Sequence, residues 1–176
     1  DMFLDLEGDP FEGPLAGPPE LRGREYLFGL VTLKGDGTPA YTAHWAETPE
    51  KEKAAFEAVM DQIALARQQH PGMHVFHYAP YEPSAFKRLM GRHATRQEEM
   101  DALLRSGTLI DLYAVVRQGL RAGVERYSIK NLEQFYGFTR DVDLRDARLN
   151  LMAMELAVSP RPLDALTQLA PPVVVL

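Results

Sequence analysis

Two carboxylates near the start of the chain have a spacing that could support chemistry. They are Asp5 and Glu7, in the run M-F-L-D-L-E-G-D-P-F of residues 2–11. Residues 2–7 predict a buried strand, in which side chains two positions apart leave the same face, roughly 6 to 7 Å apart along the backbone. Ionised carboxylates this close repel one another and are costly to bury without a positive partner. The pair therefore predicts a divalent cation, and hard oxygen ligands suit Mg²⁺ or Mn²⁺.

A third carboxylate, Asp9, lies one step further along the same predicted face. It could bind the cation directly or through water. We interpret Asp9 instead as opening a turn, because an Asp side chain readily accepts a hydrogen bond from the backbone just after it. Residues 8–24 contain four Gly and four Pro among 17 positions, which indicates a long loop of the kind used for lids or binding.

A further carboxylate, Glu82, is predicted to join this pair. The segment M-H-V-F-H-Y of residues 73–78 favours a strand, and the residues that follow favour a helix with Pro83 in its first turn. In a mixed sheet the end of this strand lies close to the first strand, so Glu82 would face the same pocket as Asp5 and Glu7. Taken alone, Glu82 is explained by the favourable position of a negative charge at a helix N-terminus.

The remaining pattern predicts the scaffold that must position these carboxylates. Residues 26–33 and 40–46 form a hairpin through the turn K-G-D-G, and Thr48 caps a helix that stops near residues 70–72. Three antiparallel strands followed by strand and helix units predict an α/β fold. Its mixed central sheet combines a three-stranded meander with parallel strands and is flanked by helices. The first strand, apolar at nearly every position, is predicted to be central.

The second half of the chain repeats the change from strand to helix. Residues 108–120 place Asp111 at such a junction. Ser128 is predicted to cap a helix over residues 129–136, which Gly137 can end. A charged segment and a helix-like stretch follow, at residues 139–148 and 149–157.

Composition bounds the class of protein. With 176 residues, 45% hydrophobic and 25% charged, the chain fits one globular domain, and its opening Asp suggests excision from a longer protein. We therefore predict a single domain over residues 1–176 with an atypical tail at 156–176. The absence of cysteine excludes disulfides and thiolate metal sites. No apolar run approaches the length of a membrane span, so a cytoplasmic protein is expected.

Charge is unevenly distributed along the chain. Residues 1–84 carry 6 basic and 14 acidic side chains, whereas residues 85–148 carry 12 basic and 9 acidic ones. The net charge of −6 argues against a protein that coats nucleic acid through bulk electrostatics. Two differently solvated faces are the simplest explanation of the asymmetry.

Five segments, in this order, carry a resemblance to a known family. They are F-L-D-L-E-G-D-P-F, Y-L-F-G, H-Y-A-P-Y-E-P-S-A-F-K-R-L, L-I-D-L-Y-A-V-V-R and Y-S-I-K-N-L-E-Q-F-Y-G-F. Over roughly residues 2–155 the chain resembles the predicted RNase H-like nuclease domain found in bacterial proteins alongside RecB-like nuclease and helicase modules. That domain is in turn similar to the DEDD 3′–5′ exonucleases. The resemblance implies an RNase H-like fold and helicase or RecB-like partners, covalently linked or associated.

The resemblance also implies roles for individual residues. Asp5 and Glu7 match the first exonuclease motif, and Glu82 falls where these enzymes place the Asp of their second motif. Tyr78 stands where they commonly have Asn. The reaction that the resemblance implies is 3′–5′ exonucleolytic hydrolysis of phosphodiesters with two Mg²⁺ or Mn²⁺ ions, on DNA rather than RNA. Asp5 would bridge both ions, Glu7 would hold the water-bearing ion and Glu82 would help on the other side.

The fourth metal ligand of the family is not found. Members usually finish with an Asp-bearing helix, often within an N-x-D-D run, and nothing like it follows residue 155. Asp111 is one candidate for this ligand. The other candidates are Asp141, Asp143, Asp146 and, in the tail, Asp164.

Several side chains are candidates for contacts with nucleic acid. Lys130 and the arginines of residues 87–148 could bind the phosphate backbone, and Tyr78, Tyr81 or Phe11 could stack on bases. Each also has a structural explanation, as a solvated surface charge or as an aromatic ring of the core.

Two other classes of function stay open. The same fold with an incomplete ligand set would serve as a nucleic-acid-binding or scaffolding module of a larger repair protein. A metal-dependent phosphatase or esterase for small molecules would fit the acidic first half but not the basic second half. A zinc site at His74 and His77 is disfavoured, because residues three apart on a strand face opposite ways and no thiolate is available.

Overall fold

A computed structural model describes residues 1–10 and 22–139 of the chain. The charged segment and the helix predicted after residue 139, the tail and Phe11 lie outside these described residues. The chain divides into two compact units, residues 1–123 and 124–176, which are described separately. The prediction of one domain over the whole chain is not tested by this division and stays a prediction.

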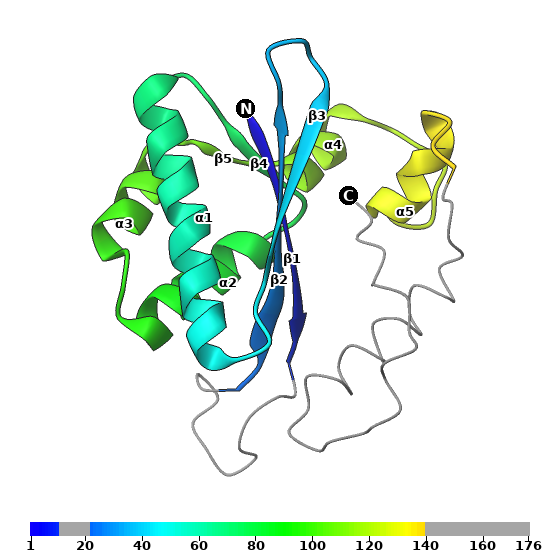
Figure 1. Cartoon of the computed structure of the whole chain (residues 1–176). Coiled ribbons are helices and arrows are strands. Elements are labelled where there is room, and N and C mark those ends of the chain that lie inside the picture. Colours follow the sequence, from blue (N-terminus) through cyan, green and yellow to red (C-terminus); the bar gives the residue numbers. More distant parts are fainter. Residues whose placement is uncertain (11–21, 140–176) are drawn as a thin grey trace. The chain divides into compact units, whose positions relative to one another are not determined.

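The first unit is built on a five-stranded mixed sheet (Figure 1). Its strands lie in the order β3-β2-β1-β4-β5. Strands β1, β2 and β3 form an antiparallel meander, whereas β4 pairs parallel to both β1 and β5. The predicted mixed sheet and the central place of the first strand are thus confirmed. The bounds are β1 (Met2–Asp9), β2 (Arg24–Leu33), β3 (Pro39–Trp45), β4 (Val75–His77) and β5 (Leu109–Asp111).

Four helices accompany this sheet. They are α1 (Pro49–Gln69), α2 (Tyr81–His93), α3 (Gln97–Arg105) and α4 (Leu112–Gly119). The hydroxyl of Thr48 accepts a hydrogen bond from the Lys51 backbone N–H, so the predicted cap of α1 is confirmed. Helix α3 was not predicted. None of the described helices is both long enough and apolar enough to cross a bilayer.

The described part of the second unit contains a short helical segment. Helix α5 (Ile129–Leu132) passes into the 3₁₀ turn η2 (Glu133–Phe135), and the left-handed backbone of Gly137 (φ 69°) follows. The hydroxyl of Ser128 accepts a hydrogen bond from the Asn131 N–H, as its predicted capping role requires. The predicted regular helix over residues 129–136 is wrong in its second half, which tightens into the 3₁₀ turn.

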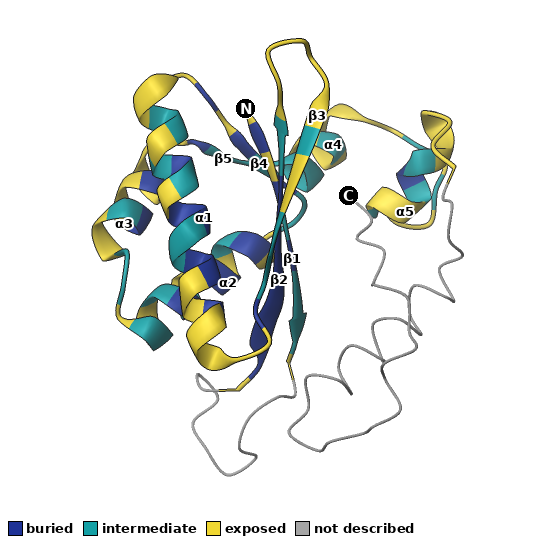
Figure 2. Ribbon diagram, viewed as in Figure 1, coloured by how far each residue is buried: buried dark blue, intermediate teal, exposed yellow. Residues whose placement is uncertain are grey.

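The hydrophobic core lies between the sheet and helices α1, α2 and α3 (Figures 1 and 2). From β1 it receives Met2, Leu4 and Leu6, because alternate side chains of a strand leave opposite faces. Asp5 and Glu7 therefore project from the other face of β1. The alternation of apolar and acidic residues along β1 therefore places the core on one face of the strand and the candidate site on the other.

Strands β1 and β4 differ in length from the prediction. β1 continues to Asp9 through a bulge between Glu7 and Gly8, where its pairing with β2 shifts register. β4 is confined to Val75–His77, shorter than the predicted 73–78. The predicted end of β4 beside β1 is nevertheless confirmed, since Phe3 pairs with Phe76.

Candidate active site

Asp5 lies in the middle of the sheet, opposite Gly29 of the neighbouring strand β2. Burial is the largest cause that raises the pKa of Asp5 from 3.8 to about 7, and the charges of Glu7 and Glu82 contribute to the same rise. Both of these side chains thus lie near enough for their charges to act on Asp5. The structure thus brings Glu7 and Glu82 within electrostatic reach of Asp5.

Glu82 occupies the first turn of α2, directly after the strand β4, as predicted. Its side chain is buried, at 4% exposure, and its Oε2 has no hydrogen-bond partner among the described residues. The nearest basic group is Nδ1 of His77, 3.6 Å from that oxygen. A buried carboxylate oxygen without a donor is costly, so Glu82 carries an acceptor that a ligand or cation could satisfy.

His77 forms a hydrogen bond within the loop that follows β4. Its Nδ1 donates to the Ala79 carbonyl over 2.7 Å, an arrangement that fixes the proton on this nitrogen. Burial by itself would lower the pKa of His77, but the contacts with Glu82 and Ala79 and the charge of Asp111 outweigh it and raise the pKa. His77 is therefore a close neighbour of Glu82 whose Nδ1 proton is engaged by the Ala79 carbonyl.

Asp111 ends β5 and caps α4, at the predicted junction of strand and helix. Its Oδ1 accepts hydrogen bonds from the backbone N–H groups of Tyr113 and Ala79, each over 2.9 Å. Ala79 has a left-handed backbone (φ 72°), which is unusual for a residue with a side chain. Asp111 thus helps to hold a strained turn between β4 and Glu82. Asp111 is not among the charges that raise the pKa of Asp5, and its role as a metal ligand stays a prediction.

The donor set fits a hard divalent cation in its chemistry. Asp5, Glu7 and Glu82 supply carboxylate oxygens, and their mutual repulsion together with the unsatisfied Oε2 of Glu82 is the pattern that a cation would relieve. Within residues 1–10 and 22–139, however, no three His, Asp or Glu side chains are grouped closely enough to hold a metal ion. The candidates Asp141, Asp143, Asp146 and Asp164 lie outside the described residues.

The predicted nucleic-acid contacts occupy different places. The ring of Tyr78 meets that of Tyr113 edge-on, with centroids 5.7 Å apart. Tyr81 is 44% exposed and its hydroxyl donates to Glu25. Lys130 is exposed on α5 of the second unit, which is described by itself.

Tyr41 is a residue of the site that the sequence did not reveal. A Cβ built on Gly29 would lie 3.2 Å from the Tyr41 hydroxyl, so the glycine makes room for this ring beside Asp5. Burial raises the pKa of Tyr41, and so do the charges of Asp5 and Glu7. The signal that could have pointed here is the glycine itself, because glycine weakens a strand interior and often marks a close approach.

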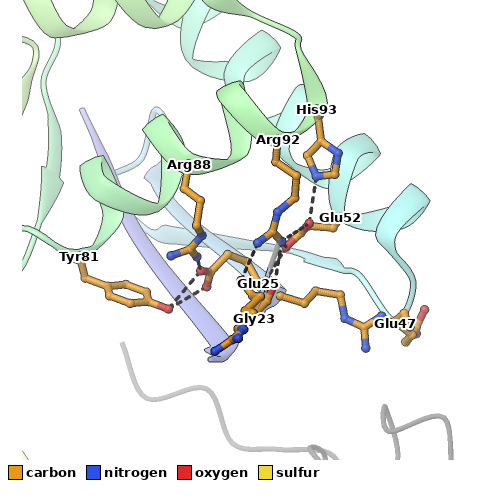
Figure 3. A network of polar contacts seen from close by, with 10 residues as sticks. Gly23, Glu25, Glu47, Glu52, Tyr81, Arg88, Arg92 and His93 are labelled. Carbon is orange, nitrogen blue, oxygen red and sulfur yellow. Dashed lines mark hydrogen bonds and ion pairs between the residues drawn. The ribbon is translucent and has the colours of Figure 1, made fainter. Parts of the chain in front are cut away.

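A network of buried charges between β2, α1 and α2 was also missed (Figure 3). Glu25 and Glu52 are each only 1% exposed, and each binds an arginine of α2: Arg88 and Arg92, respectively. A signal for this network was present in the sequence. The run R-E-Y at the start of β2 places ionisable residues at buried strand positions, where such residues are seldom found without partners.

Comparisons with known proteins identify the family of this chain. A search of curated proteins finds no match to the chain. The model of a family described as the RNase H superfamily matches residues 2–151, which include every element of the sheet and all three carboxylates of the site. Nuclease-like handling of nucleic acid is the function that this family suggests. The mixed sheet with its flanking helices and the match over most of the chain lead to one conclusion: the chain belongs to the RNase H superfamily.

Proposed function

We propose that this protein is a metal-dependent nuclease that hydrolyses DNA from the 3′ end. The observation that carries the proposal is the raised pKa of Asp5, about 7, produced by burial and by the charges of Glu7 and Glu82. Perturbed carboxylates of this kind cluster at functional sites. Membership of the RNase H superfamily supports a role in handling nucleic acid.

Asp5, Glu7 and Glu82 would hold Mg²⁺ or Mn²⁺ at the end of β1. When bound, such ions activate a water molecule and stabilise the leaving oxygen of a phosphodiester. The protein's own contribution is to orient the carboxylates. The parallel pairing of β1 with β4 brings Glu82 beside Asp5, and the turn held by Asp111 and His77 fixes the start of α2. We keep Asp111 as a candidate fourth ligand.

A polymeric substrate is favoured over a small phosphate ester by the distribution of charge. Twelve basic residues lie within residues 85–148, which can contact a phosphate backbone. Association with helicase or RecB-like nuclease modules would place this activity in DNA repair. These partners are part of the proposal and follow from the resemblance of the five segments.

The proposal is tested with single-stranded DNA labelled at one end, incubated with Mn²⁺. We expect shortening from the 3′ end by the wild-type chain, and a loss of about 100-fold or more in Asp5→Asn, since a metal-bound carboxylate contributes several kcal/mol to the barrier. Asp36→Asn is the control, because Asp36 lies in the exposed hairpin turn, where it accepts hydrogen bonds from Thr38. Degradation that survives Asp5→Asn would refute the assignment.

A catalytically impaired nucleic-acid-binding or scaffolding module is the second candidate. One observation favours it: no three potential ligands are grouped for a metal within the part of the chain that the structure describes. DNA binding without hydrolysis in Mg²⁺ or Mn²⁺, together with no metal binding in calorimetry, would select this alternative.

A further inference from the structure

Tyr41 of β3 stands on the same face of the sheet as the candidate active site. Residues that lie directly opposite one another in an antiparallel pair point to the same face, and so do residues two apart on a strand. Tyr41 pairs with Val31 of β2, which is two residues from Gly29. Gly29 in turn pairs with Asp5 of β1. The register therefore directs the side chains of Tyr41 and Asp5 to one face, and the core residues of β1 leave the other.

Gly29 allows the Tyr41 hydroxyl to lie next to the side chain of Asp5. A Cβ at position 29 would stand 3.2 Å from the hydroxyl oxygen and 3.3 Å from the neighbouring ring carbon Cε2. Directly opposed residues of an antiparallel pair have their Cβ positions only about 4.5 to 5.5 Å apart. The hydroxyl thus occupies the space that a larger residue opposite Asp5 would fill.

The Tyr41 hydroxyl has a hydrogen to donate. It forms no hydrogen bond within residues 1–10 and 22–139, and Tyr41 is 45% exposed. Burial raises the pKa of this phenol above its ordinary value, and the charges of Asp5 and Glu7 raise it as well. The hydroxyl therefore keeps its proton at neutral pH and stays a donor.

A neutral donor suits this position better than a basic one. A lysine or arginine beside Asp5 and Glu7 would pair with these carboxylates and compete with a divalent cation for them. The phenol carries no charge, so it leaves the carboxylates to the cation and still offers a hydrogen bond to an anion that the cation binds. In the proposed function this anion is a phosphate of the nucleic acid.

We propose that the Tyr41 hydroxyl donates a hydrogen bond to a non-bridging oxygen of the phosphate that is held at Asp5, Glu7 and Glu82. This inference rests on the proposed function and deepens it, because it assigns a substrate-binding residue on the β3 side of the site. β3 is an edge strand of the described sheet. The bound nucleotide therefore lies over β2 and reaches solvent at this edge.

Calorimetry tests this contact without turnover. Thymidine 5′-monophosphate in Mn²⁺ supplies a phosphate for the site, and Tyr41→Phe should bind it about three to ten times more weakly than the wild-type chain, because one hydrogen bond is lost. Thr42→Val is the matched control. It also removes a hydroxyl from β3, but Thr42 is the next residue of the strand and faces the other side of the sheet. It should bind the nucleotide as the wild type does.

Two further measurements separate substrate binding from a structural role. The urea midpoint and the Mn²⁺ affinity without nucleotide should be the same for Tyr41→Phe and the wild-type chain, since the hydroxyl has no hydrogen-bond partner among the described residues. On labelled single-stranded DNA, kcat/KM should fall about threefold to tenfold, as the nucleotide affinity does. A lower Mn²⁺ affinity in Tyr41→Phe would overturn the inference, because Tyr41 would then act through the carboxylates.

Sulfur substitution tests which atom receives the hydrogen bond. The substrate is single-stranded DNA in which sulfur replaces one non-bridging oxygen of the 3′-terminal phosphodiester, with the two diastereomers assayed separately. Sulfur is a weak acceptor, so for one diastereomer the loss of rate caused by sulfur should be about three to ten times smaller in Tyr41→Phe than in the wild-type chain. Equal losses in both proteins for both diastereomers would overturn the assignment to phosphate.

The remaining outcomes distinguish this inference from the proposed function. Wild-type nucleotide affinity in Tyr41→Phe would overturn the inference alone, because the site would still bind Mn²⁺ and its substrate. A wild-type chain that neither binds Mn²⁺ nor cleaves DNA would overturn the proposed function together with the inference.

Discussion

The carboxylate of Glu25 lies directly over Gly8, the residue that follows Glu7 in β1. A Cβ on Gly8 would stand 2.9 Å from the Arg24 carbonyl and closer still to Glu25 Oε2. The bulge between Glu7 and Gly8 thus coincides with a position where only a glycine leaves space for the buried carboxylate of Glu25.

Gly8→Ala is expected to destabilise the fold by about 1 to 3 kcal/mol, since the added methyl group has no space and must displace Glu25 or the strand. The measurement is the midpoint of urea unfolding. Gly91→Ala is the matched control: nothing lies within 4 Å of a Cβ at Gly91, and alanine in a helix interior should stabilise α2 by about 0.5 to 1 kcal/mol. Equal midpoints for both variants would contradict this packing.

Asp5 should make the metal-free fold less stable as the pH rises. The pKa of Asp5 is about 7 in the folded chain, whereas its ordinary value, taken for the unfolded chain, is 3.8. Between these two values the folded chain binds more protons than the unfolded chain, so the free energy of unfolding falls from pH 4 to pH 7. Asp5→Asn should remove this slope and raise the free energy of unfolding at pH 8 by up to about 4 kcal/mol.

Urea unfolding in EDTA from pH 4 to pH 8 provides the check. Mn²⁺ at pH 8 should stabilise the wild-type chain and not Asp5→Asn, because the ion relieves the repulsion that the variant has already lost. An Asp5→Asn profile that parallels the wild-type profile would show that Asp5 is not the group responsible.

Asp111→Ser separates two roles of this residue. Serine is as good a helix cap as aspartate, so α4 should keep its stability to within about 0.5 kcal/mol, whereas Asp111→Ala should lose about 1 kcal/mol or more. If Asp111 is also a metal ligand, Asp111→Ser should lower Mn²⁺ affinity in calorimetry while α4 stays capped, and Asp111→Asn, which keeps an oxygen for the Ala79 N–H, should lower it as well. Wild-type affinity in these two variants would restrict Asp111 to capping and to holding Ala79.

Glu52→Ala is expected to cost about 3 to 5 kcal/mol, because Glu52 is buried and accepts hydrogen bonds from the Glu25 N–H, Arg92 and His93. Removing it leaves a buried guanidinium without its counter-ion. Thermal and urea unfolding measure the loss. Glu50→Ala, in the exposed first turn of the same helix, should leave the midpoint nearly unchanged.

Local signals in the sequence were sufficient for most of the fold. The apolar run of β1 indicated its central place, Thr48 and Pro49 marked the start of α1, and the strand-to-helix changes placed Glu82 and Asp111 correctly. Each of these features depends on neighbours within a few residues.

Features without a local signal were missed. Helix α3 begins after Arg96, which has a left-handed backbone (φ 57°) and makes no capping bond with its side chain, so no start signal was present. The contact between Glu25 and Arg88 joins residues 63 positions apart. The closeness of Tyr41 to Asp5 depends on the register of β3 against β2. Only the folded chain supplies such pairings.

The start of β2 is held from two sides. Asp9 pairs with Arg24 in the last rung of the β1 and β2 ladder, and Arg92 of α2 donates to the carbonyls of Arg22 and Gly23. This double anchorage fixes the register of β2 against β1 at this end of the sheet, and the register in turn sets where Asp5 and Glu7 stand on β1.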